Sequence, residues 1–320
     1  MNYIGSKKYL LNFIQNSIKK HVGSINDKVF CDLFAGTGTV GAHFKNRVKK
    51  VIANDIEPYA YTIIYNKIKN SSTYNLNNIK YEPKEGFIYK NYALERSYFS
   101  KENAKKIDGL REAIEKSFTC KEITKDQYYY CLASLLFSAD RVANTTGVYG
   151  SFLKNMKFMA KTQLKLLAHE FELSDNEHEV YNEDANELIK KIEGDILYLD
   201  PPYNHRQYGL NYHILNTIVK NTEFEPRGIS GFDDYIRSDY CKKNRVETAL
   251  DELIKEAKFK YIFLSYSDDG ILDKMSIEKI MSKYGSYSLE KCNHSRYRTN
   301  KKSTKGCVVE YLHVVRKNAL

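Results

Sequence analysis

The sequence predicts an α/β fold with a parallel, doubly wound sheet, because strand-like apolar runs alternate with helix-like patterns in two parts of the chain. In the first part, the run at 28–33 is followed by a helix-like stretch to about Arg47, and the run at 50–54 is followed by another at 57–69. In the second part, strand-like runs return at 178–182, 195–199, 260–266, 286–290 and 307–315. No helical pattern separates the last two runs, which therefore predict a closing β-hairpin.

The two parts are separated by a stretch of different character. The second part also contains helix-like patterns, near 185–192, 208–221, 244–257 and 273–283. Between the two parts, polar loops lead to helix-like segments near 101–117 and 124–141, and the alternation stops. A chain of 320 residues exceeds the usual size of one domain, so we expect one core domain that carries an insertion. We place the core domain at 1–70 and 176–320, and a mainly helical insertion at 71–175.

The composition narrows the class of protein. The chain has no apolar run near the roughly 18 residues that a membrane span needs, and its start, MNYIGSKKYL, lacks the layout of a secretory signal. We therefore expect a soluble, cytoplasmic protein. The six cysteines show no spacing typical of a zinc site, so we expect reduced thiols and no metal. The net charge of +10 suits a polyanionic partner because neutralised phosphates release counterions, although the richness in Asn, Ile and Tyr also fits an AT-rich genome.

The turn after the first strand carries residues expected of a cofactor site. It contains Asp32, Phe34, Ala35, Gly36, Thr37 and Gly38. Glycines in a strand-to-helix turn let a ligand lie against the backbone at the carboxyl end of the strand, where open α/β sheets bind ligands. Asp55 ends the next strand, where an acidic side chain can accept both ribose hydroxyls of a nucleoside. The turn predicts a nucleoside-containing cofactor; the alternative is an ordinary strand-to-helix turn.

The cofactor is expected to be S-adenosylmethionine rather than a dinucleotide. The loop reads FAGTG and lacks the third glycine of GxGxxG, which packs helix against strand around a pyrophosphate. In addition, a cationic sulfonium prefers acidic neighbours such as Asp32 to a phosphate cradle.

A second motif, Asp200, Pro201, Pro202 and Tyr203, directly follows the apolar run ILYL. The two prolines restrict the backbone and hold the Asp200 carboxylate and the Pro201 carbonyl in one stiff geometry. Such a pair of acceptors can bind the two protons of a base amine and return electron density to its nitrogen. Tyr203 can stack on a base that has been flipped out of a duplex, which contributes roughly 1–3 kcal/mol. The alternative is a strand that ends in a proline-rigid turn.

The sequence resembles the D12 class of DNA adenine-N6 methyltransferases, over about two-thirds of the chain. The matching positions are Tyr3, Ile4, Gly5, Ser6 and Lys7, Asp32 through Gly38, Asp55, and Asp200 through Tyr203. The resemblance implies a Rossmann-like class I methyltransferase sheet, with 71–175 as a target-recognition insertion. It implies that the N-terminal segment helps to hold the methionine portion of the cofactor and that Asp55 holds the ribose. Asp184 resembles the residue that contacts the cofactor adenine, with Glu183 and Asp195 as alternatives.

The resemblance also implies double-stranded DNA as substrate, within a restriction-modification system. A restriction endonuclease acting on the same site without a stable complex is a further expectation, and a monomer is favoured. Two groups of residues are candidate DNA contacts: Arg206, Gln207 and Tyr208 after the second motif, and Arg296, Arg298, Lys301, Lys302 and Lys305 between the last two strands. The alternatives are a plain helix start for the first group and a solvated loop for the second.

Several alternatives to adenine-N6 methylation fit the residues of this sequence less well. The cytosine-C5 enzymes need a cysteine nucleophile, commonly preceded by proline, and this chain has no Pro-Cys pair. Cytosine-N4 methylation uses the same chemistry, but Ser usually stands in the place of Asp200. Enzymes that methylate protein glutamine typically carry Asn there, and RNA is a further alternative substrate. A catalytically silent DNA-binding module is the alternative from another class, and the target sequence stays open.

Overall fold

The structure of the chain is a computed structural model that describes residues 3–295 and 307–318. The chain divides into two compact units. The first, which we call the helical unit, consists of Met1–Ile4, Glu57–Leu173 and Tyr208–Ile236. The second, the sheet unit, consists of Gly5–Ile56, Ser174–Gln207 and Arg237–Leu320.

The sheet unit contains one seven-stranded mixed sheet in the order β3-β2-β1-β4-β5-β7-β6. Five strands are parallel: β1 (Val29–Asp32), β2 (Lys50–Asn54), β3 (Glu179–Tyr181), β4 (Glu193–Leu199) and β5 (Lys258–Ser267). β6 (Gly285–Ser295) and β7 (Cys307–Lys317) form the antiparallel hairpin that closes the sheet, with β7 next to β5. The strand order reverses between β1 and β4, and open α/β sheets bind ligands at the carboxyl ends of the strands at such a point. The predicted α/β class, parallel sheet and closing hairpin are confirmed.

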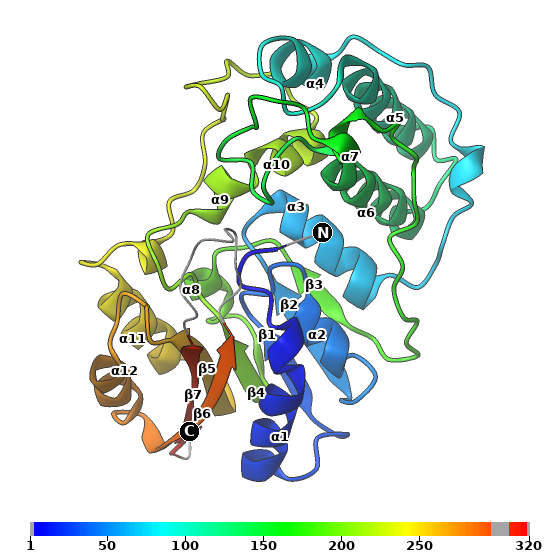
Figure 1. Cartoon of the computed structure of the whole chain (residues 1–320). Helices are drawn as coiled ribbons and strands as arrows, with labels where there is room; N and C mark the ends of the chain where they lie inside the picture. The colour runs from blue at the N-terminus through cyan, green and yellow to red at the C-terminus, as the bar shows by residue number, and fades with distance from the viewer. Residues whose placement is uncertain (1–2, 296–306, 319–320) are drawn as a thin grey trace. The chain divides into compact units, whose positions relative to one another are not determined.

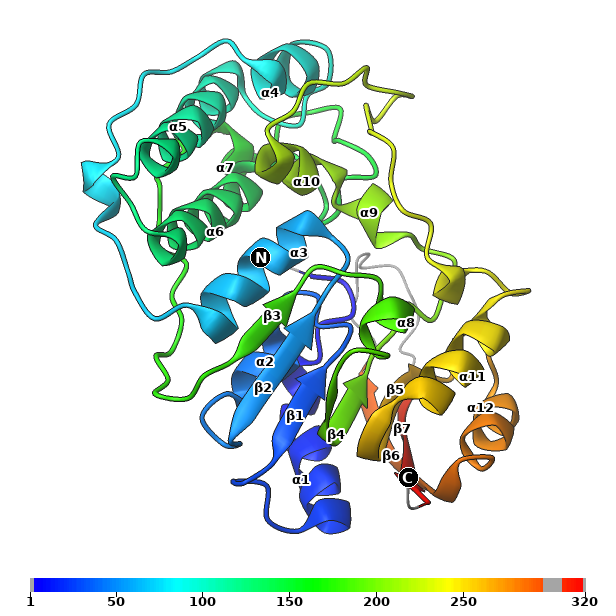
Figure 2. The same ribbon diagram turned by 180° about the vertical axis from the view of Figure 1, so that it is seen from behind.

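Helices cover both faces of this sheet. α1 (Leu11–Val22) and α2 (Thr39–Phe44) lie on one face (Figure 1), and α8 (Ala185–Leu188), α11 (Val246–Glu256) and α12 (Lys274–Met281) lie on the other (Figure 2). On β5, Ile262 and Leu264 pack into the core with the second group of helices, while Phe263 lies 6.1 Å from the His21 ring of α1. Because both faces are covered, the inner strands contain runs of consecutive apolar residues, as parallel strands usually do.

The helical unit is organised around two long helices that the sequence predicts. α5 (Lys101–Thr119) begins at the cap residue Ser100, and α6 (Lys125–Val142) begins with a capping box formed by Thr124 and Gln127. The other elements of this unit are α3 (Pro58–Ile64), a π-helix (Tyr65–Lys69), a 3-10 helix (Leu76–Asn78), α4 (Phe87–Tyr89), a second π-helix (Lys90–Leu94), α7 (Phe158–Lys161), α9 (Tyr208–Asn211) and α10 (His213–Lys220).

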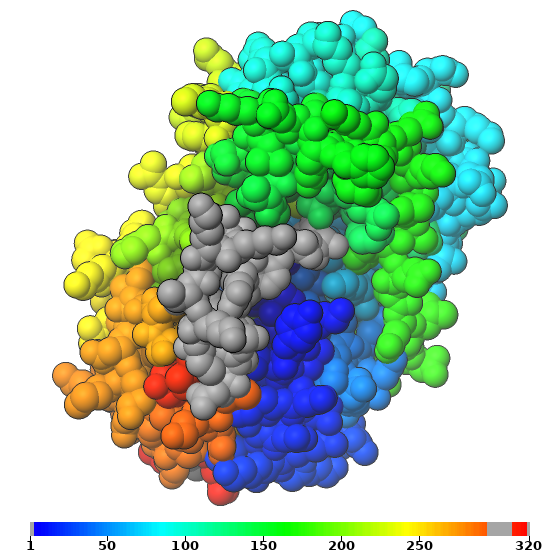
Figure 3. Space-filling model, in the orientation of Figure 1, coloured from blue at the N-terminus to red at the C-terminus, as the bar shows by residue number. Residues whose placement is uncertain are grey.

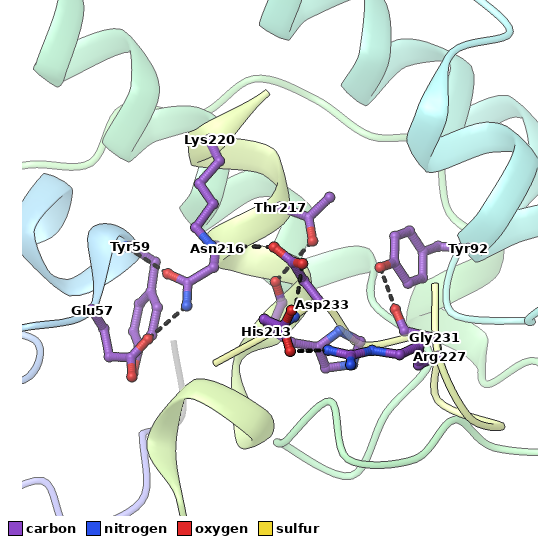
Figure 4. Close-up of polar contacts among 11 residues, drawn as sticks. Glu57, Tyr59, Tyr92, His213, Asn216, Thr217, Lys220, Arg227, Gly231 and Asp233 are labelled. Carbon is purple, nitrogen blue, oxygen red and sulfur yellow. Dashed lines mark hydrogen bonds and ion pairs between the residues drawn. The ribbon is translucent and has the colours of Figure 1, made fainter. Parts of the chain in front are cut away.

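Polar contacts of α10 explain the boundaries of the helical unit (Figure 4). Asn216 accepts a hydrogen bond from the Tyr59 amide at 3.0 Å and donates to Glu57 Oε2 at 2.6 Å. The Tyr92 hydroxyl donates to the Gly231 carbonyl at 2.5 Å. These contacts join 57–69 and 208–236 to the helices between 87 and 142. The compact unit is therefore larger than the segment 71–175 at which we placed the insertion, and target recognition by this unit stays a prediction.

Within the described residues, no helix is both long enough and apolar enough to cross a membrane.

Candidate active site

The glycine loop after β1 is fixed at the carboxyl ends of the strands. Gly36 and Gly38 have φ values of 54° and 68°, a left-handed conformation that glycine adopts without steric cost. The Gly36 amide donates to Asp55 Oδ2 at 2.8 Å, and the Ala35 amide donates to the Asn54 carbonyl at 2.9 Å. The structure therefore brings Asp55 directly to the loop, and its carboxylate supports the turn.

Asp32 is a buried carboxylate beneath this loop. It is 1% exposed, and its Oδ2 accepts a hydrogen bond from the Gly41 amide, in the first turn of α2, at 2.8 Å. Burial raises the pKa of Asp32 to about 7, the Gly41 hydrogen bond lowers it, and the charges of Asp200 and Asp55 raise it. Asp32 thus organises the start of α2, and its expected effect on the cofactor sulfonium stays a prediction.

Asn54, the last residue of β2, is a structural residue that the sequence analysis missed. Its buried side chain donates to the carbonyls of Leu33 at 3.2 Å and Glu183 at 3.0 Å, and it accepts from the Glu183 amide at 3.0 Å. It therefore ties together the segments that follow β1, β2 and β3. An asparagine at the end of the apolar run KVIAN is the signal that could have identified it, because a buried amide needs partners.

The Asp200–Tyr203 turn leaves β4, the parallel neighbour of β1. Asp32 is paired in register with Tyr198, and the Leu33 amide donates to the Tyr198 carbonyl at 3.2 Å. The glycine loop and the Asp200 turn therefore begin side by side, where the strand order of the sheet reverses.

Lys7 lies between two carboxylates at this point. Its Nζ is 2.9 Å from Asp200 Oδ1 and 3.1 Å from Glu310 Oε1. Glu310, on β7, also accepts a hydrogen bond from the Ser265 hydroxyl of β5 at 2.7 Å. Burial lowers the pKa of the Lys7 ammonium, but the charges of Asp200 and Glu310 together raise it more, so that the pKa of Lys7 lies well above its usual value. With one cation and two anions, the cluster carries a net negative charge.

Glu310 is a site residue that was not predicted from the sequence. It stands as the one acidic residue in the apolar run CVVEYLHVV, and a carboxylate at a core position requires a cation or several hydrogen-bond donors. The sequence therefore shows that Glu310 needs a partner. It does not show that the partner is Lys7, because some 300 residues of chain separate the two.

The side chains of Asp200 and Tyr203 are held in defined positions. Burial raises the pKa of Asp200 to about 6, the Lys7 ammonium lowers it, and the Glu310 carboxylate raises it further. The Tyr203 ring lies 5.5 Å from the Tyr266 ring and 5.4 Å from Lys7 Nζ. Burial also raises the pKa of Tyr203 to about 12, so its hydroxyl remains protonated near neutral pH.

The predicted N-terminal segment divides between the two units. Gly5, Ser6 and Lys7 belong to the sheet unit, whereas Tyr3 and Ile4 belong to the helical unit. There, Tyr3 stacks on Tyr212 at 4.9 Å between ring centroids, and the Ile4 amide donates to the Tyr212 hydroxyl at 3.0 Å.

Asp184, a further candidate for the cofactor site, caps α8. Its Oδ1 accepts from the amides of Asn186 at 2.9 Å and Glu187 at 3.2 Å. The two alternatives are engaged elsewhere: Glu183 forms an ion pair with Lys191 at 2.5 Å, and Asp195 accepts from the Val29 amide at 2.9 Å.

Two further residues of the predicted loop have local contacts. Phe34 contacts the edge of the Tyr240 ring at 5.1 Å, and the Thr37 hydroxyl lies 3.4 Å from that of Thr39.

The candidate DNA contacts differ in exposure. Arg206 is exposed, whereas Gln207 accepts from the Ser238 amide at 3.0 Å and Tyr208 donates to the Ile4 carbonyl at 3.3 Å. The second group, Arg296, Arg298, Lys301, Lys302 and Lys305, lies outside the described residues.

Comparisons with known proteins show the family of this chain. A family model described as D12 class N6 adenine-specific DNA methyltransferase matches residues 3–283. The type II methyltransferase M.NlaIII of Neisseria lactamica is 46% identical, and the alignment covers 99% of each chain. The type II methyltransferase M.FokI of Planomicrobium okeanokoites is 36% identical over 99% of this chain, which spans 53% of that relative. A solved magnesium protoporphyrin IX methyltransferase from Synechocystis PCC 6803 aligns at 9% identity over 97% of this chain and 79% of its own, with a TM-score of 0.36, too low to support an argument.

The matched family model extends from the Lys7 segment through the glycine loop and past the Asp200 turn, and a relative of equal length shares nearly half of its residues. The chain belongs to the D12 class of N6 adenine-specific DNA methyltransferases.

Proposed function

We propose that this chain binds double-stranded DNA, flips out one adenine, and holds its N6 between the Asp200 carboxylate and the Pro201 carbonyl during direct methyl transfer. The observation that carries this proposal is the position of the Asp200–Tyr203 turn. It leaves the sheet beside the glycine loop, where the strand order reverses and α/β folds bind their ligands. A cofactor on the loop and a base at the turn would then be neighbours.

S-adenosylmethionine would supply an electrophilic methyl group at this position. The residues present fit such a cofactor. The left-handed Gly36 and Gly38 allow a ligand to approach the backbone closely, and Asp55 lies at the end of β2, where a ribose would bind.

Asp200 accepts a hydrogen bond from the N6 amine most strongly when it is ionised, and only the ionised carboxylate can take up a proton. Burial opposes ionisation, and the Lys7 ammonium favours it. Lys7 therefore acts as a positioning residue for Asp200, a different role from the methionine contact that the resemblance implies. After the new bond forms, N6 carries an extra proton, which an Asp200 carboxylate with a pKa of about 6 can accept and then release.

Tyr203 would stack on the flipped adenine, and its ring orientation is set before the base arrives. The Ile271 amide donates to the Tyr203 carbonyl at 2.8 Å, and Tyr266 supports the ring. A preset ring reduces the ordering cost of base binding.

The proposal includes a partner and a setting. A restriction endonuclease that acts on the same site, a monomeric state and a cytoplasmic location remain predictions. The first of these draws support from relatives named as type II methyltransferases.

Asp200→Ala tests the proposal. We expect transfer of a tritiated methyl group to DNA to fall by about 10²–10³-fold or more, since an electrostatic contact to the reacting group is lost. Cofactor affinity, measured by calorimetry, should change little, and Glu310 would keep the Lys7 ammonium paired. Glu193→Ala is the matched control, because Glu193 is an exposed carboxylate at the opposite end of β4. Wild-type turnover in Asp200→Ala would refute the assignment.

A further inference from the structure

A segment of the helical unit is strongly basic. Between residues 141 and 169 the chain has no Asp or Glu, and it has five cations: Arg141, Lys154, Lys157, Lys161 and Lys165. All except Lys157 are exposed, and none of these four has an ion-pair partner within residues 3–295 and 307–318. Lys157 is different, because its Nζ donates to the Thr145 carbonyl at 2.8 Å. In the part of the chain that the structure describes, these four exposed positive charges therefore have no carboxylate within ion-pair distance.

Large apolar side chains are exposed in the same segment. Phe158 is 80% exposed and Met159 is 40% exposed, both in the short helix α7 between Lys157 and Lys161. In Figure 3, the green atoms around residues 150–165 lie on the visible face of the helical unit. Single exposed apolar side chains are common on protein surfaces, but exposed apolar side chains within a cluster of exposed cations are typical of nucleic-acid interfaces.

The backbone of the segment is fixed by two buried asparagines. Asn144 donates to the Leu153 carbonyl at 2.9 Å and accepts from the Lys157 amide at 3.0 Å. Asn103, on α5, donates to the Thr162 carbonyl at 2.8 Å. Both asparagines are at most 1% exposed. The exposed side chains between these anchors thus project from an ordered backbone, which lowers the entropy cost of binding a rigid partner.

We infer that Arg141, Lys154, Phe158, Lys161 and Lys165 form a surface that binds double-stranded DNA. This inference rests on the proposed function, which supplies DNA as the substrate. The cations contact phosphates, which receive half or more of the hydrogen bonds in protein–DNA complexes. Phe158 makes apolar contact with the groove, as Phe does with the methyl group of thymine. A membrane surface fits less well, because α7 has four residues and interfacial helices are much longer.

The triple variant Lys154→Gln, Lys161→Gln, Lys165→Gln tests the phosphate contacts. The measurement is DNA affinity by fluorescence anisotropy between 50 and 200 mM salt, with full-length protein and S-adenosylhomocysteine present. Each lost phosphate contact should reduce the slope of log K against log salt by about 0.9, so we expect a reduction of about 3. Thermal stability should be unchanged, because the three side chains are exposed and unpaired in the described structure.

Lys84→Gln is the matched control. Lys84 lies in the same unit and is 55% exposed, but it pairs with Glu112 at 2.9 Å, so its loss should leave the salt slope unchanged. Phe158→Ala should weaken binding about 5- to 150-fold with an unchanged salt slope, since its contact is apolar. Leu94→Ala, at a side chain 50% exposed in the same unit, controls for the loss of exposed apolar area.

The outcomes separate this inference from the proposed function. If the wild-type protein methylates DNA while the triple variant keeps the wild-type salt slope, the surface is not a DNA interface and the proposed function stands. If the wild-type protein transfers no methyl group to DNA, the proposed function fails. If the triple variant instead loses affinity only for anionic lipid vesicles, the surface binds membranes and the inference is wrong.

Discussion

The pH dependence of methylation should report the ionisation of Asp200. With a pKa of about 6, Asp200 is about 90% ionised at pH 7 and about 10% ionised at pH 5. Because only the ionised carboxylate can accept the N6 proton, kcat/KM should fall by about tenfold between pH 7 and pH 5. The measurement is tritiated methyl transfer at low substrate concentration, corrected for protein stability at each pH.

Glu310→Gln identifies the group that causes this fall. Asp200 Oδ1 and Glu310 Oε1 lie no more than about 6 Å apart, since they are 2.9 and 3.1 Å from the same Lys7 Nζ. At an effective dielectric constant of 20, two unit charges at that distance interact by about 3 kcal/mol. The Glu310 charge raises the pKa of Asp200, so its removal should move the acid limb to lower pH, by about two pH units. The substituted amide would retain an acceptor for the Ser265 hydroxyl, which limits the structural change.

Two other kinds of titrating group lie near Asp200. The pKa values of Tyr198 and Tyr203 are raised by burial, so neither ionises in this range. Asp32 does titrate here, because burial and the charges of Asp200 and Asp55 raise its pKa to about 7, but Glu310 is not among the groups that shift it, so Glu310→Gln should move the Asp200 limb and not that of Asp32. Glu290→Gln is the matched control, because Glu290 is also a paired carboxylate of the hairpin but bonds to Lys20 at 2.7 Å. An acid limb that stays in place or moves to higher pH in Glu310→Gln would refute the reasoning.

Three further predictions concern the same site. Asp32 has a pKa of about 7 in the folded protein and near 3.9 in the unfolded chain, so the free energy of unfolding should fall as pH rises between these values, by about 4 kcal/mol in total. Asp32→Asn should remove this pH dependence, which denaturant unfolding at pH 5 and pH 8 measures. If wild type and variant differ in stability by the same amount at both pH values, the argument is wrong. Gly38→Ala should lower the free energy of unfolding by about 1–2 kcal/mol, because φ is 68°, and an unchanged denaturation midpoint would count against the strain argument. Tyr203→Ala should reduce kcat/KM about 5- to 150-fold through lost stacking, whereas Tyr203→Phe should retain most activity; equal losses would assign the effect to the hydroxyl.

The sheet was predictable from the sequence because its parallel strands are covered on both faces. Such strands bury side chains on both faces, and the runs at 28–33, 50–54 and 195–199 accordingly contain consecutive apolar residues. α1 was not predicted. Its buried positions, Ile14, Ser17 and Ile18, include a serine and few apolar residues in a largely polar helix, which weakens the periodicity.

The division into units was harder to predict. The helical patterns at 57–69 and 208–221 are apparent in the sequence, but their apolar faces do not specify which other helices they pack against. The contacts of Asn216 with Glu57 and Tyr59 assign them to the helical unit. Packing partners of this kind depend on pairs of residues far apart in the chain, which a single sequence does not reveal.

The sequence motifs predicted the reaction, but they did not predict all the residues of the site. The glycine loop, Asp55 and the Asp200 motif predicted the family, and the comparisons confirm adenine-N6 methylation of DNA over cytosine-N4 methylation and over a silent DNA-binding module. Glu310 and the contact of Lys7 with Asp200 were not predicted, because ion pairs between chain ends leave no local pattern.

The position of Glu310 on β7 means that the closing hairpin both completes the sheet and places a carboxylate beside Lys7. Side chains of a strand alternate between its two faces, so a shift of one residue in the pairing of β7 with β5 would turn Glu310 away from Lys7. A single residue inserted or deleted near the start of this strand could thus preserve the hydrogen-bonded ladder and still abolish the reaction. Engineering of the C-terminal hairpin should therefore keep its alignment with β5, even where the fold tolerates a change.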